Sequence, residues 1–240
     1  MLRTHALSKT FGAQRALDGL DLGIAPGEIF CMLGANGAGK TTTIKLLLGF
    51  LKPTSGTAVV DGIDVQADPV QARRRLLYLP EQVALYGELS GLENLRYFAG
   101  LAGVPDCTPK RLRGWLARAG VPAAAIDRRA GGYSKGMRQK VAIALAIARS
   151  ARGLLLDEPT SGLDPAASAE FHRLLLEQRD AGAAVLMATH DLFRAREVAT
   201  TIGLMRDGRL LRRFKAQELS ARELEQLYLD EMSAPSCREY

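Results

Sequence analysis

A glycine-rich octapeptide, Gly34–Thr41, constrains this chain more than any other feature, because it fits the pattern G-x-x-x-x-G-K-[ST]. The apolar run Ile29–Leu33 precedes it and a helical pattern starts at Lys40, so we expect a buried strand to enter the loop and a helix to leave it. Glycines allow several backbone N–H groups to turn toward one anion, and the helix N-terminus adds its positive dipole end. The pattern predicts a phosphate-binding loop in which Lys40 contacts the β- and γ-phosphates and Thr41 offers its hydroxyl to Mg²⁺. The predicted nucleotide contacts of this loop are Gly34, Ala35, Asn36, Gly37, Ala38, Gly39, Lys40, Thr41 and Thr42.

Two adjacent carboxylates follow a second apolar strand pattern. The residues Leu154–Leu156 run directly into Asp157 and Glu158. Isolated acids at the end of a buried strand would be costly to desolvate, and a metal ion with a water molecule accounts for both. We expect Asp157 to help hold Mg²⁺ and Glu158 to act as the general base on the attacking water. The alternative is a strand that simply ends in two solvated acids.

One histidine, His190, ends the apolar strand pattern Val185–Thr189. At the exit of a strand in the same sheet, its side chain can donate a hydrogen bond to the γ-phosphate and so take part in catalysis. A lone histidine is also commonly structural, and both roles remain open.

A phosphate loop by itself is compatible with GTPases, kinases, helicases and transporters. The chain has only two asparagines, Asn36 and Asn94, and neither begins an Asn-Lys-x-Asp motif that would read guanine. We therefore expect the nucleotide to be ATP.

Strand and helix patterns alternate along the chain except between residues 84 and 150, where helical patterns follow one another and are broken by prolines. The predicted fold is α/β: a P-loop NTPase RecA-like core, an N-terminal antiparallel β subdomain and an inserted α-helical subdomain at about 84–150. We expect a nucleotide-binding domain over residues 1–215 and a helical tail over 216–240 that frays at its end. The predicted strands are Leu2–Leu7, Leu20–Ile24, Ile29–Leu33, Thr57–Val60, Gly153–Leu156, Ala183–Thr189, Ile202–Met205 and Arg209–Phe214. The predicted helices include Lys40–Phe50, Lys140–Arg149, Ala166–Asp180 and Gln217–Met232.

A second candidate anion site lies in the helical part of the chain. Ser134 is a natural N-cap, and its hydroxyl, the N–H groups that follow and the helix dipole can bind an anion. Two half-sites on one chain predict two chains that face each other, with each phosphate held between one P-loop and the Ser134 helix of the second copy.

The order of these motifs resembles that of the nucleotide-binding subunits of ABC transporters, over nearly the whole chain. The resemblance rests on Phe11, the loop Gly34–Thr41, the Q-loop region Tyr78–Gln82, the signature Tyr133–Gln139, the pair Asp157 and Glu158, the D-loop Ser161–Asp164 and His190. It implies that Phe11 stacks on adenine and that His190 is the switch histidine. It implies that Ser134, Gly136 and Asp164 contribute to nucleotide sites. It also implies ATP-driven closure of a head-to-tail dimer, followed by hydrolysis and reopening.

Two motifs depart from the family pattern. The usual signature Leu-Ser-Gly-Gly-Gln reads Tyr-Ser-Lys-Gly-Met, with Ser134 and Gly136 retained. The glutamine usual after the Q-loop proline is replaced by Glu81, with Gln82 one position later, and the residue that senses Mg²⁺ and the attacking water is one of these two. Both departures resemble the ABC-2-type exporter subfamily, which implies outward transport of drugs, sodium, polysaccharides or haem-related cargo.

The resemblance also implies two protein partners: an integral membrane permease subunit on a separate chain, and a second nucleotide-binding subunit that forms a homodimer or a paired dimer. The segment Ala84–Leu89 is expected to contact a coupling helix of the permease, and its alternative role is packing within the helical subdomain. Apolar runs such as Val141–Ala148 are too short to cross a bilayer, and residues 1–5 lack a signal-peptide core. We expect a cytoplasmic protein that is peripheral on the inner face of the cell membrane.

The basic residues are dispersed. The net charge of +6 comes from small separated groups, and aromatic residues make up only 6% of the chain, so no nucleic-acid partner is expected. The three cysteines match no metal spacing and favour a reducing compartment. The alternative function is a soluble ABC-type ATPase that acts on ribosomes or DNA. The presence of one cassette argues against the ribosomal class, and the lack of heptads argues against the DNA class.

Overall fold

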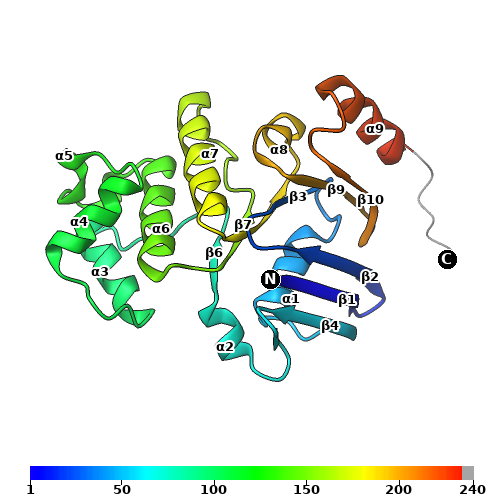
Figure 1. Ribbon diagram of the computed structural model, residues 1–240, viewed down its shortest axis with the longest axis horizontal. Coiled ribbons are helices and arrows are strands. Elements are labelled where there is room, and N and C mark those ends of the chain that lie inside the picture. Colours follow the sequence, from blue (N-terminus) through cyan, green and yellow to red (C-terminus); the bar gives the residue numbers. More distant parts are fainter. Residues whose placement is uncertain (234–240) are drawn as a thin grey trace.

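A computed structural model describes residues 1–233, and its strands form two sheets (Figure 1). The first sheet is antiparallel, in the order β2-β1-β4-β5. The second has the order β10-β9-β3-β8-β7-β6 and is parallel from β9 to β6, with β10 antiparallel at one edge. The strands of the first sheet are β1 (Leu2–Phe11), β2 (Gln14–Ile24), β4 (Ser55–Val60) and β5 (Ile63–Asp64). Those of the second are β3 (Ile29–Leu33), β6 (Leu76–Leu79), β7 (Gly153–Asp157), β8 (Ala184–Thr189), β9 (Thr201–Arg206) and β10 (Arg209–Lys215). The predicted α/β class with an N-terminal antiparallel part is confirmed.

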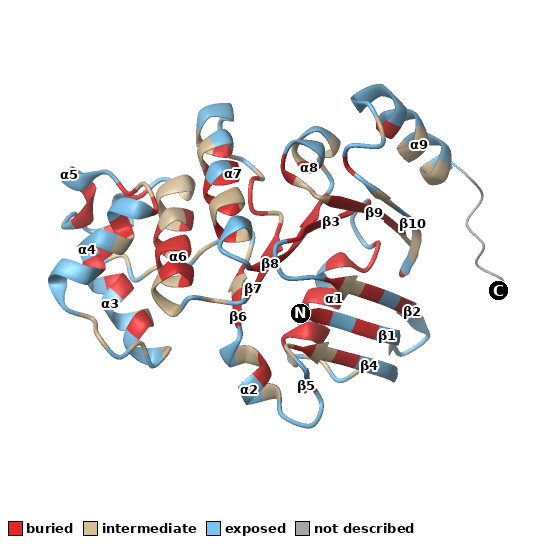
Figure 2. Cartoon of the chain, viewed as in Figure 1, coloured by how far each residue is buried: buried red, intermediate tan, exposed pale blue. Residues whose placement is uncertain are grey.

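The central strands of the parallel sheet are apolar except at the carboxyl ends of β7 and β8, because both of their faces are covered. Every residue of β3, β7 and β8 is buried, and Figure 2 shows these strands as continuous red. The carboxyl ends of the three strands meet at one edge of the sheet. Gly34 follows β3, Glu158 follows β7 and His190 follows β8. The sheet thus brings three distant motifs to the edge where α/β folds bind ligands.

The helices are divided between this sheet and a separate group. The helices are α1 (Lys40–Leu47), α2 (Pro69–Arg74), α3 (Gly91–Leu101), α4 (Pro109–Arg118), α5 (Ala123–Ile126), α6 (Lys135–Arg149), α7 (Pro165–Asp180), α8 (Leu192–Val198) and α9 (Ala221–Ser233), with a 3₁₀ turn at Ala130–Gly132. Helices α3 to α6 lie together at the left end of Figure 1, where Leu95, Leu116 and Val141 form part of a shared core. The P-loop therefore belongs to the sheet, whereas the start of α6 belongs to the helical group.

Several helices begin at side-chain caps, and three of these caps are at α3, α6 and α7. Ser90 and Glu93 form a capping box at the start of α3. At α6, Ser134 Oγ accepts a hydrogen bond from the Met137 backbone N–H. At α7, the Asp164 carboxylate accepts one from a backbone N–H, and a proline occupies the first turn. These caps fix where the helices begin, and hence where Ser134 and Asp164 lie.

The structure extends several predicted elements. Helix α6 begins at Lys135, directly after its cap Ser134 and five residues before the predicted start at Lys140. The apolar periodicity did not reveal this first turn, because its residues are mostly polar. Strand β1 continues to Phe11, and β2 begins at Gln14 rather than Leu20. The strands predicted at Ile202–Met205 and Arg209–Phe214 pair as the hairpin β9–β10, and its two turn residues both have positive φ, as a tight type I′ connection requires.

Some elements had no prediction. These are β5, β6, α2 and α8, although Asp68 before Pro69 is a recognisable start signal for α2, where its carboxylate caps the helix. The predicted tail helix is present as α9 and is shifted by a few residues. The predicted fraying concerns residues 234–240, which lie outside the described residues.

Candidate functional site

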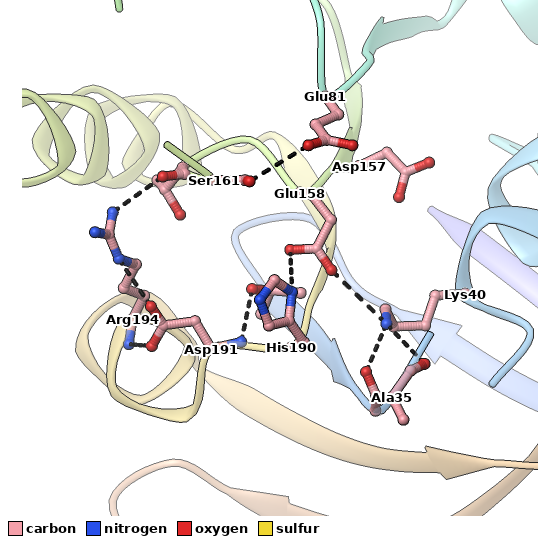
Figure 3. A network of polar contacts seen from close by, with 12 residues as sticks. Ala35, Lys40, Glu81, Asp157, Glu158, Ser161, His190, Asp191 and Arg194 are labelled. Atoms are coloured by element: carbon pink, nitrogen blue, oxygen red, sulfur yellow. Dashed lines mark hydrogen bonds and ion pairs between the residues drawn. The ribbon is translucent and has the colours of Figure 1, made fainter. Parts of the chain in front are cut away.

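Lys40 stands at the first turn of α1 and turns its amine back over the P-loop. Its Nζ donates to the Gly34 carbonyl at 2.6 Å and to the Ala35 carbonyl at 3.2 Å, and the side chain is only 6% exposed (Figure 3). Burial lowers the pKa of this amine, against the opposing effect of nearby carboxylates. The preceding residue, Gly39, has φ +105°, and a Cβ there would lie 2.7 Å from the Ala16 carbonyl. The loop therefore presents a poorly hydrated cation that an anionic ligand would stabilise.

Thr41 and Asp157 form an oxygen pair beside this amine. Thr41 Oγ1 lies 2.9 and 3.1 Å from the two carboxylate oxygens of Asp157. Asp157 is buried, and this burial raises its pKa above the ordinary range even though the Thr41 hydroxyl donates to it. A hydroxyl and a carboxylate are ligands that hard divalent cations prefer. Within residues 1–233 no cluster of three or more His, Cys, Asp or Glu side chains could hold a metal. A cation bound here would therefore need other ligands, such as phosphate oxygens.

Glu158 lies between the P-loop lysine and His190 (Figure 3). Its Oε2 is 3.0 Å from His190 Nδ1, and its Oε1 is 3.7 Å from Lys40 Nζ. Oε1 is buried and has no hydrogen-bond partner, so it can accept one from a bound water molecule or ligand. The backbone of Glu158 adopts φ +47°, an unusual value for a residue with a side chain. The two predicted catalytic residues are thus paired with each other, and the role of His190 toward a phosphate remains a prediction.

A cavity of about 380 Å³ connects these groups. Phe11 lies on its lining with 46% of its surface exposed, as a residue that stacks on a flat ring would. Gln14 and Ala16 also line it, and sequence analysis missed both because nothing in the first strands marks them. The full lining is Phe11, Gln14, Ala16, Asn36, Gly37, Ala38, Gly39, Lys40, Thr41, Thr42, Glu81, Asp157 and Glu158. A larger cavity of about 830 Å³ between α2, α3 and α6 contains none of the predicted phosphate ligands, so volume alone does not identify the site.

The two Q-loop candidates lie in different places. Glu81 lines the P-loop cavity, and its Oε1 accepts a hydrogen bond from Ser161 Oγ at 3.3 Å. Gln82 instead lines an apolar cavity with residues such as Leu85 and Val141. The geometry therefore favours Glu81 as the residue that reaches the nucleotide.

Five predicted nucleotide contacts are absent from the cavity lining: Gly34 and Ala35 at the start of the P-loop, and three residues outside the loop. Ser134 is exposed at the start of α6, Gly136 packs near Leu163, and Asp164 caps α7. The structure thus separates the predicted sites into a pocket formed by the chain itself and a second group outside that pocket.

Comparisons with known proteins place this geometry in a family. Residues 17–161, more than half of the 240 residues, match the family model of the ABC transporter. The chain is 36% identical over 220 residues to the daunorubicin/doxorubicin resistance ATP-binding protein of Streptomyces peucetius, covering 92% of this chain and 67% of that protein. It is 39% identical over 219 residues to ATP-binding cassette sub-family A member 7 of Rattus norvegicus, covering 90% of this chain. The chain spans only 10% of the length of that second relative.

A solved structure is also similar. It is a dimeric ATP-binding cassette in a post-hydrolysis state with ADP and Pi, with a TM-score of 0.80 and 26% identity over 90% of this chain and 99% of that chain. No helix within residues 1–233 is both long and apolar enough to cross a bilayer. The family model and the Streptomyces relative agree with the P-loop, the carboxylate pair and the two-sheet fold. The chain therefore belongs to the ABC transporter family, as one of its ATP-binding cassettes.

Proposed function

We propose that this cassette, which binds and hydrolyses ATP, drives an exporter of the ABC-2 type through a membrane permease on a separate chain. The observation that carries the proposal is the convergence of Lys40, the Thr41–Asp157 pair and Glu158 at one cavity, with His190 paired to Glu158 from outside the cavity lining. The Streptomyces relative is described as a drug-resistance ATP-binding protein, which supports export over an action on ribosomes or DNA.

The residues of the cavity divide the work of hydrolysis. Lys40 and the loop N–H groups hold the β- and γ-phosphates, and Phe11 stacks on the base. Thr41 and Asp157 would hold Mg²⁺, which when bound would neutralise charge on the phosphate oxygens. The buried, protonation-prone state of Asp157 supports this assignment, because a cation beside it would favour the carboxylate.

Glu158 acts as the general base. The water oxygen attacks the γ-phosphorus, the bond between that phosphorus and the β–γ bridging oxygen breaks, and the products are ADP and phosphate. Oε1 of Glu158 has no hydrogen-bond partner and accepts the proton of the water, while His190 orients the carboxylate through Oε2. Glu81 lines the same cavity, which supports it over Gln82 as the Q-loop residue that senses Mg²⁺ and the attacking water.

Hydrolysis requires a second copy of the cassette. Ser134 is exposed on the helical group and does not line the P-loop cavity, so it contacts a phosphate only when another subunit brings one to it. Gly136 and Asp164 belong to the same outer surface. We place two copies head to tail, with each ATP between one P-loop and the Ser134 helix of the facing copy. The dimeric form of the similar cassette supports this arrangement.

The permease contact is assigned to an aromatic surface on the helical group. Tyr86, in the segment Ala84–Leu89, is 52% exposed, and its ring lies edge-on to Tyr97 with centroids 5.1 Å apart. Leu85 packs against the core, so the segment is partly anchored and partly presented to solvent. A permease contact through this surface would put the cassette on the inner face of the membrane, in the cytoplasm, and the exposed aromatic rings support that proposal.

The decisive experiment is reconstitution. The cassette is combined in proteoliposomes with the polytopic membrane protein encoded beside its gene, and ATP hydrolysis and substrate efflux are measured. We expect hydrolysis to be stimulated by the permease and reduced toward its basal rate by Tyr86→Ala, with Tyr228→Ala on α9 as a control. A cassette that hydrolyses ATP equally well with and without the permease, and does not bind the vesicles, would refute the export proposal.

A further inference from the structure

The segment Pro159–Leu163 follows Glu158, and side chains of helices α6 and α8 donate hydrogen bonds to its backbone carbonyls. From α6, the buried side chain of Gln139 donates through Nε2 to the Pro159 carbonyl. From the same helix, Lys135 Nζ donates to the Ser161 carbonyl at 2.5 Å. One side of this segment is therefore attached to the helical group that carries the signature.

The opposite side of the segment is held by one residue of α8. Arg194 donates through Nη1 to the Thr160 carbonyl at 3.2 Å and through Nη2 to the Leu163 carbonyl at 3.4 Å. It also donates to Ser168 Oγ on α7 and pairs through Nε with Asp191 Oδ2 at 2.9 Å. The guanidinium fork thus satisfies several acceptors from separate segments at once, which a lysine ammonium cannot do with the same geometry.

The two elements that Arg194 joins, the Pro159–Leu163 segment and Asp191, each adjoin one residue of the Glu158–His190 pair. The Ser161 N–H donates to the Glu158 carbonyl at 3.2 Å, so the segment starts from the base, whose own N–H is held by the Ala188 carbonyl of β8 at 2.9 Å. Asp191 follows His190 directly and caps α8 by accepting the backbone N–H of Arg194. Figure 3 shows Arg194 and Asp191 beside the pair formed by Glu158 and His190.

We propose that Arg194 is a positioning residue for hydrolysis: it ties the Pro159–Leu163 segment to the residue after His190, and so fixes Glu158 and His190 relative to each other. The proposal deepens the proposed function and rests on its assignment of Glu158 as base. Arg194 does not line the nucleotide cavity, so it acts through the pair rather than on the phosphate.

If Arg194 had only a structural role, Arg194→Ala would lower the melting temperature without lowering kcat selectively over KM. Misplacement of catalytic groups by about 1 Å can reduce a rate by about 100-fold while ground-state binding is kept. We therefore expect Arg194→Ala to lower kcat about 10- to 100-fold and to leave the KM for ATP within about twofold, because Lys40 and Phe11 are untouched.

Helix α8 also provides a matched control at Arg196, and a conservative variant can be made at Arg194 itself. Arg196 of α8 is exposed and donates to the Leu219 carbonyl, away from the segment, so Arg196→Ala should retain kcat. Arg194→Lys keeps the charge beside Asp191 but cannot hold both carbonyls, and we expect it to recover part of the lost rate. It also keeps the test decisive if Arg194→Ala folds poorly.

A double-mutant cycle shows whether Arg194 acts through the pair. With His190→Ala as background, removal of Arg194 should cost less than about twofold in kcat, because the arrangement that it supports is already lost. Multiplicative losses, or an Arg194→Ala protein with wild-type kcat, would overturn the positioning role. Either result leaves the export proposal standing, since that proposal fails on absent permease coupling in the wild-type protein.

Discussion

The nucleotide pocket and the Ser134 end of α6 are both suited to phosphate, but the chain completes only the pocket. In the pocket, the charged groups have partners within the chain: Lys40 donates to loop carbonyls, and Glu158 pairs with His190 through Oε2. At the other site, Ser134 Oγ accepts one local N–H and is exposed to solvent. In the proposed head-to-tail pair, one copy would bind the ligand and two copies would enclose it, and the following variants test that difference.

The largest effect is expected for Glu158→Gln. The amide keeps the size of the side chain but cannot take a proton, so ATP hydrolysis should fall by about 10²- to 10⁴-fold. ATP binding should persist and hold two copies together, which size-exclusion chromatography with ATP would detect as a dimer. Turnover near the wild-type rate would show that the base is another residue.

Ser134→Asp tests whether the second site works between copies. Aspartate caps a helix as well as serine does, so α6 should stay folded, but its charge would repel the γ-phosphate and reduce hydrolysis by about 100-fold or more. Ser134→Asn, an uncharged cap, is the matched control and should retain more activity.

Mixing sharpens this test. A Ser134→Asp copy paired with a Lys40→Ala copy leaves one composite site intact, so a mixture of the two inactive proteins should regain measurable hydrolysis. If the mixture stays inactive while the mixed dimer forms, the two sites do not act across copies.

Phe11→Ala tests the open side of the pocket. Loss of a stacking contact worth about 0.5–1.5 kcal/mol should raise the KM for ATP by about two- to tenfold, with kcat unchanged. Phe50→Ala is the control, because Phe50 is also exposed but stacks on Arg73 outside the pocket. An unchanged KM would remove Phe11 from the nucleotide site.

The smallest effect, on stability, is expected for Asp157→Asn. Burial raises the pKa of Asp157, so the folded state favours the protonated side chain. The stability that this protonated form contributes is fully present below the ordinary carboxyl pKa and is lost as pH rises through the pKa of the folded state. Without nucleotide at pH 7, the ionised carboxylate of Asp157 destabilises the folded protein, and Asp157→Asn removes it. The melting temperature should rise by about 2–4 °C for each kcal/mol of destabilisation removed, and this gain should shrink as pH is lowered. Hydrolysis should be lost. A lower melting temperature at pH 7 would show that the carboxylate stabilises the empty pocket.

The sequence was sufficient to predict site residues where the functional residues are consecutive in the chain. The loop Gly34–Thr41 and the pair Asp157–Glu158 were recognisable because each is a short run next to an apolar strand, and the structure brings them into one cavity. Gln14 and Ala16 could not be found in this way. They line the cavity only because β2 passes the P-loop, and their residue types carry no signal of their own.

The sequence by itself determined the α/β class, the phosphate loop and the cap at Ser134, since periodicity and capping depend on residues a few positions apart. Only the tertiary structure placed Glu81 in the lining of the P-loop cavity and Gln82 in that of another, paired Glu158 with His190, and gathered Gln139, Lys135 and Arg194 around one segment. Those contacts join residues up to 80 positions apart, as for Ser161 and Glu81, and the packing of the strands and helices sets such distances.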